Sequence, residues 1–509
     1  MTDLAIELIG ICKSFGAVAA NRDVDMQIAK GSIHGVIGEN GAGKSTLMSI
    51  LYGYYQADAG TIRVNDRDAA IHNSQEAIRL GIGMVHQHFM LVDTFTVLEN
   101  IILGAEGGLV LKHGMRQARA HLQELNREYG LEVDPDAVVG KLGVGLQQRV
   151  EILKALYRGA EVLILDEPTA VLTPQEADHL FRILRTLKAQ GKTVILITHK
   201  LREVLEITDA VTVMRTGQVV GNVRTCDVSK TDLADMMVGR KVSLQVDKRD
   251  AAPGEVVLAV DALNLVDDRG VGRLKDINFN VRAGEIVGIA GVAGNGQSEL
   301  LEVLAGMVEP TSGGVAYKGQ DLGKLRYRQP KAAALRGMGI AHVPEDRSRE
   351  GLVKAFATYE NAILGYQRDR SVCKGLLYSR RALLERANGL IRQFDIRPDN
   401  PTLRAGLLSG GNQQKVVLAR EIHANPDLLL VGQPTRGVDI GAIEFIHRRL
   451  IELRDAGKAI LLVSVELEEI MSLSDRILVM AGGQITGEIA GKDATAQALG
   501  LLMGGGDKH

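Results

Sequence analysis

The 509-residue sequence lacks a surplus of charge of either sign, because 60 lysine and arginine residues stand against 62 aspartate and glutamate residues. Such a balance gives no electrostatic case for nucleic acid as the main partner, and none is expected. Cysteine is scarce as well: Cys12, Cys226 and Cys373 are odd in number and far apart. They form neither a disulfide framework nor a zinc-binding spacing, which indicates a reducing compartment.

Long apolar runs are also missing. No stretch approaches the roughly 20 apolar residues that a membrane-spanning helix needs. The N-terminal residues contain no basic segment ahead of an apolar one, so no secretory signal is expected. The protein is therefore expected to be soluble or peripheral, and any role at a membrane requires a partner that spans it.

The sequence contains an internal repeat, with the same series of segments in its first and second halves. Matching segments follow the same order in both halves, and their offset drifts only from 253 (33 to 286) to 266 (209 to 475). The matching pairs are 33–47 with 286–300, 95–104 with 356–365, 162–173 with 428–439, and 209–223 with 475–489. This repetition predicts two tandem domains of ordinary size. The expected boundaries are domain 1 at 1–243, a polar linker at 244–255, domain 2 at 256–503 and a flexible tail at 504–509.

Two kinds of segment alternate within each copy. Short β-branched runs such as VLILD and TVILIT are separated by longer helical patterns such as QEADHLFRILRTLKAQG. That alternation predicts parallel strands joined by crossover helices, which is an α/β fold in each domain.

The segment GENGAGKST in the first copy fits the pattern G-x-x-x-x-G-K-[ST] and lies between a strand-like and a helix-like run. Glycines let backbone N–H groups surround phosphates, and the helix that follows directs its positive end at them. Lys44 would contact the β- and γ-phosphates of ATP, and the Ser45 hydroxyl would be a Mg²⁺ ligand. The predicted ATP-binding loop comprises Gly38, Glu39, Asn40, Gly41, Ala42, Gly43, Lys44, Ser45 and Thr46.

The strand-like run VLILDE ends in two acids, Asp166 and Glu167. A buried strand that ends in a carboxylate suits a magnesium-associated Asp166, and Glu167 could polarise the attacking water. A core strand with surface acids at its end explains the same residues equally well when the segment is taken alone. The phosphate-binding loop upstream favours the catalytic interpretation.

Further segments make both halves similar to ATP-binding-cassette (ABC) ATPases: GMVHQHFML, KLGVGLQQRVEILKAL, DEPTA and the histidine after VILIT. The resemblance implies two P-loop NTPase domains, each with a RecA-like α/β core, an antiparallel β subdomain and a helical subdomain. It also implies that Gln87 touches the metal and senses the transporter, that His199 contacts the γ-phosphate, and that Phe15 stacks on adenine. Phe15 could equally be a core aromatic. His199 could be a strand-end histidine, but its place directly after VILIT favours function.

The second copy has lost most of the residues that handle ATP. The counterparts of Lys44, Asp166, Glu167 and His199 are, in that order, Gln297, Gly432, Gln433 and Val465. These residues bring neither a cation to the phosphates nor a carboxylate to the metal or the water. The loop itself keeps Gly291, Gly294, Gly296 and Ser298, so weak nucleotide binding remains conceivable. Glu345 in HVPEDR is the candidate counterpart of Gln87, and no aromatic residue replaces Phe15 between Val257 and Asp276.

The signature motif shows the opposite distribution. The second copy has LLSGGNQQK, close to the family's LSGGQ, whereas the first has KLGVGLQQR, with Gly143 in place of the serine and Leu146 in place of the glutamine. In the ABC family each ATP lies between the phosphate loop of one domain and the signature of the other, so the resemblance implies that the two cassettes pair within the chain. One composite site then joins the intact motifs of domain 1 to the signature residues Ser409, Gly410, Gly411 and Asn412. The other composite site contains nearly all of the positions at which an ATP-handling residue has been replaced, so no hydrolysis is expected there.

Transport is the favoured function within this family. Soluble two-cassette factors that act on ribosomes or DNA usually keep both phosphate loops and carry long charged linkers or cysteine-rich insertions, which this sequence lacks. GVAGNGQSEL, PEDR and LSGGNQQK are similar to importers of simple sugars and nucleosides. GIGMVHQHFMLV favours the nucleoside branch, whose binding proteins are basic-membrane-protein-type lipoproteins, and simple-sugar import is the alternative.

The same resemblance implies the partners and the place of action. Two transmembrane permease subunits would bind the ATPase, and a substrate-binding lipoprotein or periplasmic protein would act indirectly. The chain would lie peripherally at the cytoplasmic face of the cell membrane, with ATP and Mg²⁺ as its ligands. Residues from Gln87 to about 140 would form the helical subdomain that receives the permease, and residues 373–400 would do so in the second half.

Overall fold

The chain divides into two compact units, Met1–Val242 and Ser243–His509, and each is described by itself. In this computed structural model the described residues are 3–16, 18–86, 89–104, 111–169, 172, 174–242, 248–292, 294–327, 330–374 and 377–503. Gln87, the tail 504–509 and part of the predicted linker lie outside them. Among the described residues, no helix combines the length and the apolar character needed to cross a bilayer.

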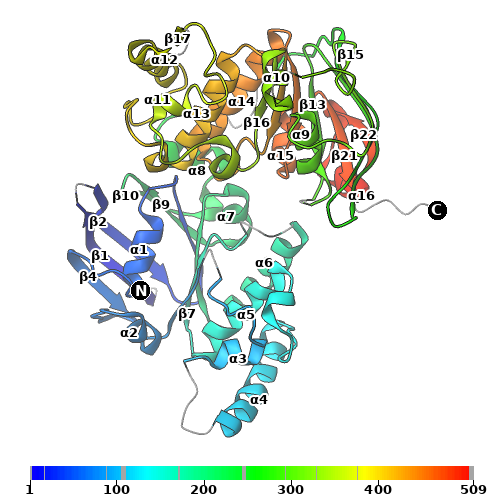
Figure 1. The fold of residues 1–509 in the computed structure, drawn as a ribbon. Coiled ribbons are helices and arrows are strands. Elements are labelled where there is room, and N and C mark those ends of the chain that lie inside the picture. Colours follow the sequence, from blue (N-terminus) through cyan, green and yellow to red (C-terminus); the bar gives the residue numbers. More distant parts are fainter. Residues whose placement is uncertain are drawn as a thin grey trace. The chain divides into compact units, whose positions relative to one another are not determined.

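Unit 1 begins with a four-stranded antiparallel sheet in the order β2-β1-β4-β5 (Figure 1). Every second residue along β2 from Val24 to Ile28 is buried, so one face of this sheet belongs to the core. The strands are β1 (Leu4–Phe15), β2 (Val18–Ala29), β4 (Ala59–Val64) and β5 (Arg67–Asp68).

A six-stranded sheet in the order β10-β9-β3-β8-β7-β6 forms the centre of unit 1, and only β10 runs antiparallel to its neighbour. Strands β3, β7 and β8 are buried throughout, which explains their continuous apolar sequences. The strands are β3 (Ile33–Ile37), β6 (Ile82–Val85), β7 (Val162–Asp166), β8 (Thr193–Thr198), β9 (Ala210–Arg215) and β10 (Gln218–Arg224).

Two cores lie on the two faces of this central sheet. Along β7, Val162 and Ile164 join the core that contains α1 and the antiparallel sheet, whereas Leu163 and Leu165 join the core of the helical layer. The helices are α1 (Lys44–Leu51), α2 (Ser74–Arg79), α3 (Val97–Ile102), α4 (Leu111–Tyr129), α5 (Val144–Tyr157), α6 (Pro174–Ala189), α7 (Leu201–Ile207) and α8 (Lys230–Val238), with short helices η1 (Val139–Lys141) and η2 (Thr225–Asp227).

Unit 2 repeats both sheets. Its antiparallel sheet has the order β12-β11-β14-β15, and its central sheet has the order β16-β19-β20-β13-β21-β22, which is the order of unit 1 when corresponding strands are matched. The strands are β11 (Val256–Val266), β12 (Gly272–Arg282), β13 (Ile286–Ala290), β14 (Ser312–Tyr317), β15 (Gln320–Asp321), β16 (Ile340–Val343), β19 (Leu428–Gly432), β20 (Ala459–Val463), β21 (Arg476–Ala481) and β22 (Gln484–Ala490), with a small hairpin of β17 (Cys373–Lys374) and β18 (Leu377–Tyr378).

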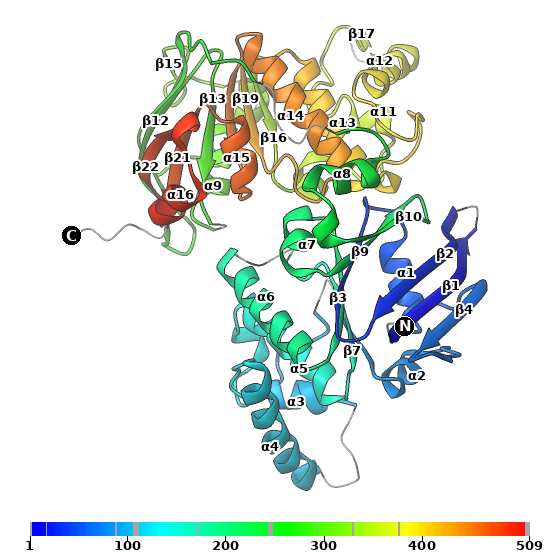
Figure 2. The ribbon, with the colours of Figure 1, turned by 180° about the vertical axis from the view of Figure 1, so that it is seen from behind.

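The helices of unit 2 also follow the plan of unit 1, with α9 against the antiparallel sheet and α12, α13 and α14 in the core on the other face of the central sheet (Figure 2). The helices are α9 (Gln297–Leu304), α10 (Lys331–Gly337), α11 (Thr358–Asn361), α12 (Arg380–Gln393), α13 (Gly410–His423), α14 (Ile440–Asp455), α15 (Leu467–Leu473) and α16 (Ala496–Met503), with short helices η3 (Arg347–Gly351), η4 (Ala405–Leu407) and η5 (Gly491–Asp493). The predicted α/β core with an antiparallel β subdomain and a helical subdomain is confirmed in both units.

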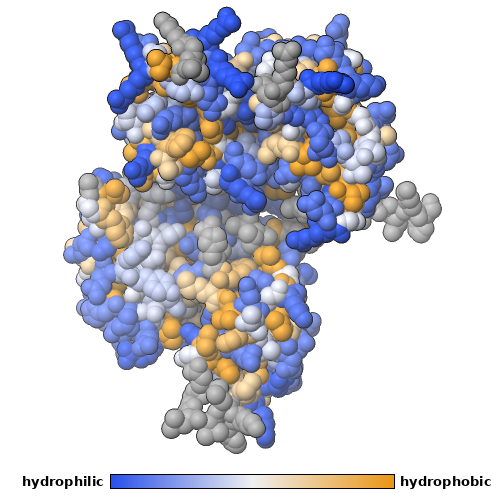
Figure 3. All heavy atoms as spheres, viewed as in Figure 1, coloured by the Kyte–Doolittle hydropathy of each residue, from blue (hydrophilic) through white to orange (hydrophobic). Residues whose placement is uncertain are grey.

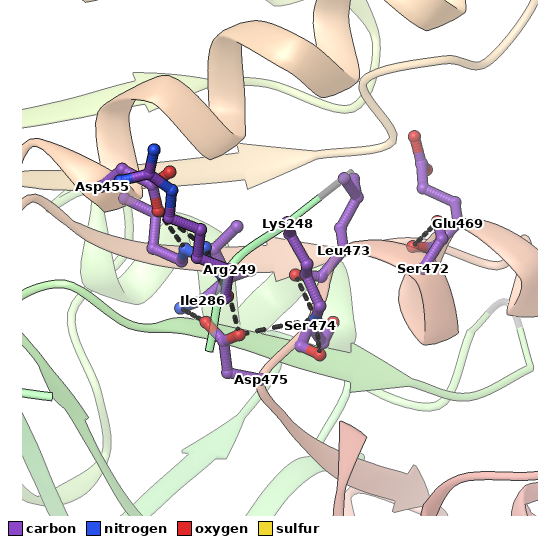
Figure 4. Close-up of polar contacts among 10 residues, drawn as sticks. Lys248, Arg249, Ile286, Asp455, Glu469, Ser472, Leu473, Ser474 and Asp475 are labelled. Carbon is purple, nitrogen blue, oxygen red and sulfur yellow. Dashed lines mark hydrogen bonds and ion pairs between the residues drawn. The ribbon is translucent and has the colours of Figure 1, made fainter. Parts of the chain in front are cut away.

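Lys248 and Arg249 tie the start of unit 2 to its core (Figure 4). Lys248 Nζ donates to the carbonyls of Leu473 and Ser474, at 3.2 and 2.6 Å. The guanidinium of Arg454, which is only 1% exposed, donates to Asp475 Oδ1 at 2.8 Å and to the Arg249 carbonyl at 2.9 Å. The chain before β11 therefore covers a buried ion pair in unit 2.

The corresponding pair in unit 1 is open to solvent. Lys188 and Asp209 occupy the positions of Arg454 and Asp475, and their charged atoms lie 2.5 Å apart. Their side chains are 39% and 40% exposed. Both units thus have an ion pair at this position, and they differ in the solvent exposure of its side chains.

Candidate active site

The phosphate loop of unit 1 runs from the end of β3 to the start of α1. Gly41 and Gly43 have φ values of 83° and 97°, which is the left-handed region that favours glycine. A Cβ on Gly43 would lie 2.3 Å from the carbonyl oxygen of Ala20. The buried side chain of Asn21 donates to the Gly43 carbonyl at 3.2 Å. Sequence reasoning missed Asn21, because it lies on β2 and only the fold brings it to the loop.

Lys44 lies within the curve of this loop. Its ammonium donates to the carbonyl oxygens of Gly38 and Glu39 at 2.7 and 2.9 Å, and the residue is 5% exposed. The cation is thus held beside the backbone N–H groups that begin α1. Positive charge and the positive end of a helix converge here, as phosphate binding requires.

Asp166 ends β7 and reaches across to the loop. Burial raises the pKa of Asp166 above its ordinary value, and the nearby Ser45 hydroxyl opposes this rise. A hydroxyl and a carboxylate are the hard oxygen donors that Mg²⁺ takes in proteins. The residues present therefore fit magnesium at this position.

Glu167 contacts His199, a contact that the predicted roles of the two residues did not include. His199 Nδ1 and Glu167 Oε1 lie 2.8 Å apart, and this hydrogen bond is the main reason why the pKa of Glu167 lies below its ordinary value. Glu167 has a left-handed φ of 47°, fixed by the bond from its N–H to the Ile197 carbonyl at 2.9 Å. An ionised carboxylate in this place can accept a proton from water.

Phe15 lies at the end of β1 and is 44% exposed, so it is not a core aromatic. Its ring meets Tyr55 edge to face, with 5.1 Å between the ring centroids, and the ammonium of Lys13 lies 5.6 Å from its centroid. An exposed aromatic face remains a suitable surface for a nucleotide base.

The loop of unit 2 repeats the backbone of the first. Gly294 and Gly296 have φ values of 89° and 102°. Gln297 is 5% exposed, as Lys44 is, and its side-chain amide donates to the Val292 carbonyl at 3.1 Å. The amide occupies the position of the lysine without carrying its charge.

The end of β19 likewise keeps the backbone of β7. Gln433 has a φ of 46°, and its N–H donates to the Val463 carbonyl at 2.8 Å. Its side-chain oxygen accepts a hydrogen bond from the backbone N–H of Val465 at 3.2 Å. A neutral amide held by a backbone group replaces the carboxylate held by a histidine.

Glu345 is the other residue whose contact sequence reasoning missed. The Ser298 hydroxyl donates to Glu345 Oε2 at 2.7 Å. Glu345 follows β16 by two residues, and Gln87 follows β6 by two residues, in strands that pair with β19 and β7 in the same register. The strand register agrees with the predicted correspondence of Glu345 to Gln87, whereas the contact with Ser298 could not have been read from the sequence.

The two signature segments differ in the residue that directly precedes their helices. Ser409 caps α13, since its hydroxyl accepts from the N–H of Asn412 at 3.4 Å and from the side-chain amide of Asn412 at 2.9 Å. Gly143 stands at the same position of α5 and has no hydroxyl to offer. Only the helix of unit 2 presents a serine hydroxyl beside its N-terminal N–H groups.

A phosphate loop between β3 and α1, with a cation in its curve and acids at the end of β7, defines a P-loop ATPase whose architecture occurs twice. The family described as "ABC transporter" matches residues 21–170 and 274–436, and the chain belongs to this family.

Relatives with import functions match the whole chain. A guanosine import ATP-binding protein of Bacillus subtilis is 48% identical, over 99% of this chain and 98% of the relative. A nucleoside import ATP-binding protein of Lactococcus lactis is 46% identical, over 99% of both chains. A ribose import ATP-binding protein of Rubrobacter xylanophilus is 42% identical, over 99% of this chain and 98% of the relative. The predicted ABC transport ATPase with two cassettes is confirmed.

A solved structure matches across both units. It is the complex of an archaeal ribosomal stalk protein with an archaeal ribosome recycling factor, matched with a TM-score of 0.63 and 19% identity over 97% of this chain and 92% of that chain. Identity this low shows a shared fold alone.

Proposed function

We propose that the chain drives import of nucleosides by hydrolysing ATP at one composite site. The contact between Glu167 and His199 carries the proposal, because unit 2 has only Gln433 and a backbone N–H in its place. A carboxylate with a lowered pKa is ionised and can act as a base, whereas an amide has no site for the proton.

Each residue of the site has a role that follows from its contacts. Lys44 neutralises charge on the phosphates, Glu167 takes the proton of the attacking water, and His199 holds that carboxylate in place. Ser45, Gln87 and Asp166 would hold Mg²⁺, which supplies further neutralisation of the phosphate charge when bound.

The signature of unit 2 would complete this site through pairing of the cassettes within the chain. The Ser409 hydroxyl and the N–H groups that begin α13 are suited to the γ-phosphate, with Gly410, Gly411 and Asn412 as the rest of the motif. The opposite pairing would join Gln297, Gly432, Gln433 and Val465 to the segment from Gly143 to Leu146. That second site has neither a base nor a lysine, so we expect hydrolysis at the first site alone.

Two observations support a permease-binding surface on unit 1. A hollow of about 120 Å³ lies between β6 and α5, with Tyr54, His86 and Met90 among its lining residues. Met90 is 59% exposed and Phe95 is 38% exposed. Figure 3 shows hydrophobic side chains at the surface of the helical layer, over α3 and α4. We propose that two transmembrane permease subunits bind the ATPase at the cytoplasmic face of the membrane, with a substrate-binding lipoprotein acting through them.

Replacing Met90 by aspartate tests this surface. A charged side chain in an apolar contact costs free energy, so the variant should co-purify with the permeases less well. Lys141→Asp, also in the helical subdomain but outside the hollow, serves as the matched control. If both variants co-purify with the permeases equally well, the surface around Met90 does not bind the permeases.

The identity of the relatives favours nucleosides as the transported substrate. The guanosine and nucleoside import proteins are 48% and 46% identical to this chain. A glucose import protein of Haloferax volcanii, at 45%, keeps simple sugars as the second candidate. Uptake of labelled guanosine and of labelled ribose or glucose by cells with and without the chain decides between them. Loss of sugar uptake alone on deletion would overturn nucleoside import.

A further inference from the structure

We propose that Arg347 is a positioning residue for ATP hydrolysis, because it joins the loop after β19 to the start of α13 and so holds Ser409 in place for the γ-phosphate. The inference rests on the proposed function, since it takes the signature of unit 2 as part of the working site. It also gives a role to the arginine of PEDR, which no step of the proposed reaction uses.

The guanidinium of Arg347 binds two carbonyls in the loop between β19 and α14. Its Nη1 donates to the carbonyl of Arg436 at 2.6 Å, and its Nη2 donates to the carbonyl of Gly437 at 3.3 Å. The planar group has several N–H donors in a fixed arrangement, so one side chain can hold two consecutive peptide units. The loop after β19 is therefore tied to the segment after β16.

The same guanidinium lies against the first residue of α13. A Cβ built on Gly410 would lie 2.5 Å from Nη2 of Arg347 and 2.9 Å from the carbonyl oxygen of Gly437. The arginine thus packs directly on the backbone of the helix, in space that the glycine leaves. Because Gly410 follows the cap residue Ser409, the guanidinium lies next to the part of the signature that is suited to the γ-phosphate.

The short helix η3, which carries Arg347, is held at both ends. At its start the Asp346 carboxylate accepts hydrogen bonds from two backbone N–H groups of η3, at 2.9 and 3.2 Å. At its end the guanidinium of Arg420, which is only 3% exposed, donates to the carbonyl of Gly351 at 2.9 Å. A residue can position a site accurately only when it is itself held in place. The helix η3 meets this condition.

Unit 1 has neither the arginine nor the glycine. Phe89 follows β6 by four residues, as Arg347 follows β16, in strands that pair with β7 and β19 in the same register. Val144 is the first residue of α5, as Gly410 is of α13. Unit 1 adopts the same fold without this contact, so the fold alone does not require it. The arginine and the space for it occur together in the unit whose signature has a serine.

Loss of the guanidinium would leave the start of α13 without this support. Stabilisation of charge in a transition state depends on donors that are already in place, and a misplacement of about 1 Å can cost about 10²-fold in rate. Binding of ATP to unit 1 depends on Lys44 and on the N–H groups that begin α1. The expected result is a fall in kcat with little change in the binding of ATP by unit 1.

Turnover of the full-length chain bound to its permeases tests the proposal. Arg347→Ala should lower kcat about 10²-fold, while photolabelling of unit 1 by 8-azido-ATP stays within about twofold of wild type. Arg347→Lys keeps a cation with fewer donors, so its kcat should fall only about tenfold. Arg349→Ala removes an exposed arginine from the same short helix and serves as the matched control, with a kcat within about twofold of wild type.

Addition of free guanidinium distinguishes positioning from a folding defect. Arg347→Ala leaves space for this ion beside the two carbonyls, so guanidinium chloride far below denaturing concentrations should raise kcat of the variant about tenfold. The same salt should leave the kcat of wild type unchanged, and sodium chloride at equal concentration controls for ionic strength. Amide exchange in the strands of unit 2 should be the same in Arg347→Ala and wild type.

Three results overturn the inference. The first is a kcat of Arg347→Ala within about threefold of wild type, and the second is an equal fall in Arg349→Ala. The third is a low kcat that guanidinium does not raise, with faster amide exchange throughout unit 2, since it would show a role in folding. If Arg347→Ala does not fold, Arg347→Lys decides, and a kcat within about twofold of wild type then contradicts the inference.

Failure of the proposed function would be seen in other measurements. Missing nucleoside uptake with normal ATP hydrolysis would contradict the proposed substrate and leave the role of Arg347 intact. Normal hydrolysis by Glu167→Gln would contradict the single catalytic site, whatever the result for Arg347.

Discussion

The ends of β7 and β19 have almost the same backbone and different chemistry. Glu167 and Gln433 have φ values of 47° and 46°, and the N–H of each donates to the neighbouring strand at 2.9 and 2.8 Å. What differs is one atom of the side chain and its partner, a histidine ring for Glu167 and a backbone N–H for Gln433. The fold sets the geometry in both units, and a titratable group that can accept a proton is present in only one of them.

A second comparison concerns the ion pair behind each central sheet. Arg454 is 1% exposed beneath the segment of Lys248 and Arg249, whereas Lys188 is 39% exposed. An arginine suits the buried position because its planar guanidinium bonds several acceptors at once. Here it contacts Asp455, Asp475 and a carbonyl. The segment of Lys248 and Arg249 thus buries in unit 2 an ion pair that is exposed in unit 1.

The largest difference between the copies is expected at the two loops. Lys44→Ala removes the cation from the phosphates and should lower ATP hydrolysis about 10³-fold. Gln297→Ala removes no charge and should change hydrolysis less than about threefold. Phosphate release by the ATPase bound to its permeases measures both. Similar losses from the two substitutions would contradict the assignment of hydrolysis to unit 1.

The ion pairs should differ next in their contribution to stability. Arg454→Met leaves Asp475 buried without its guanidinium and should destabilise unit 2 by about 3–5 kcal/mol. Lys188→Met breaks an exposed pair and should cost unit 1 about 0–1 kcal/mol. Native-state hydrogen exchange at the amides of β13 and of β3 reports the two units separately. A loss in unit 1 as large as that in unit 2 would show that burial is not the deciding factor.

His199 should set the acidic limit of hydrolysis. His199→Ala removes the hydrogen bond that keeps the pKa of Glu167 low, so this pKa rises and the carboxylate becomes protonated at a higher pH. The acidic limb of the pH–rate profile should therefore move to higher pH, and the rate at neutral pH should fall about 10²-fold. Val465→Ala in unit 2 is the matched control. An unmoved acidic limb would mean that the contact does not tune Glu167.

The smallest effect is expected at the signature helices. Ser409→Ala removes the cap of α13 and should cost about 1 kcal/mol, which speeds amide exchange in the first turn about fivefold. Gly143→Ser offers a cap to α5 and should slow exchange there by a similar factor. Unchanged exchange in both helices would show that the serine does not act as a cap.

Local motifs made much of the fold and site predictable from the sequence. The spacing in GENGAGKST fixes a loop within one strand and one helix, and runs such as VLILD are apolar because both faces of the sheet are covered. Contacts between distant segments were not predictable. Glu345 can reach Ser298 because Gly432 has no side chain in its way. In the sequence Arg454 corresponds to the exposed Lys188, and only the structure shows that the segment at Lys248 buries it.

The turnover of Glu167→Gln, compared with that of Gln433→Ala, tests the central claim most directly. Both variants are assayed with their permeases, and bound ATP is measured in parallel. We expect Glu167→Gln to bind ATP and to hydrolyse it at least about 10³-fold more slowly than wild type, and Gln433→Ala to hydrolyse it within about threefold of wild type. Normal hydrolysis by Glu167→Gln would contradict the account of a single catalytic site.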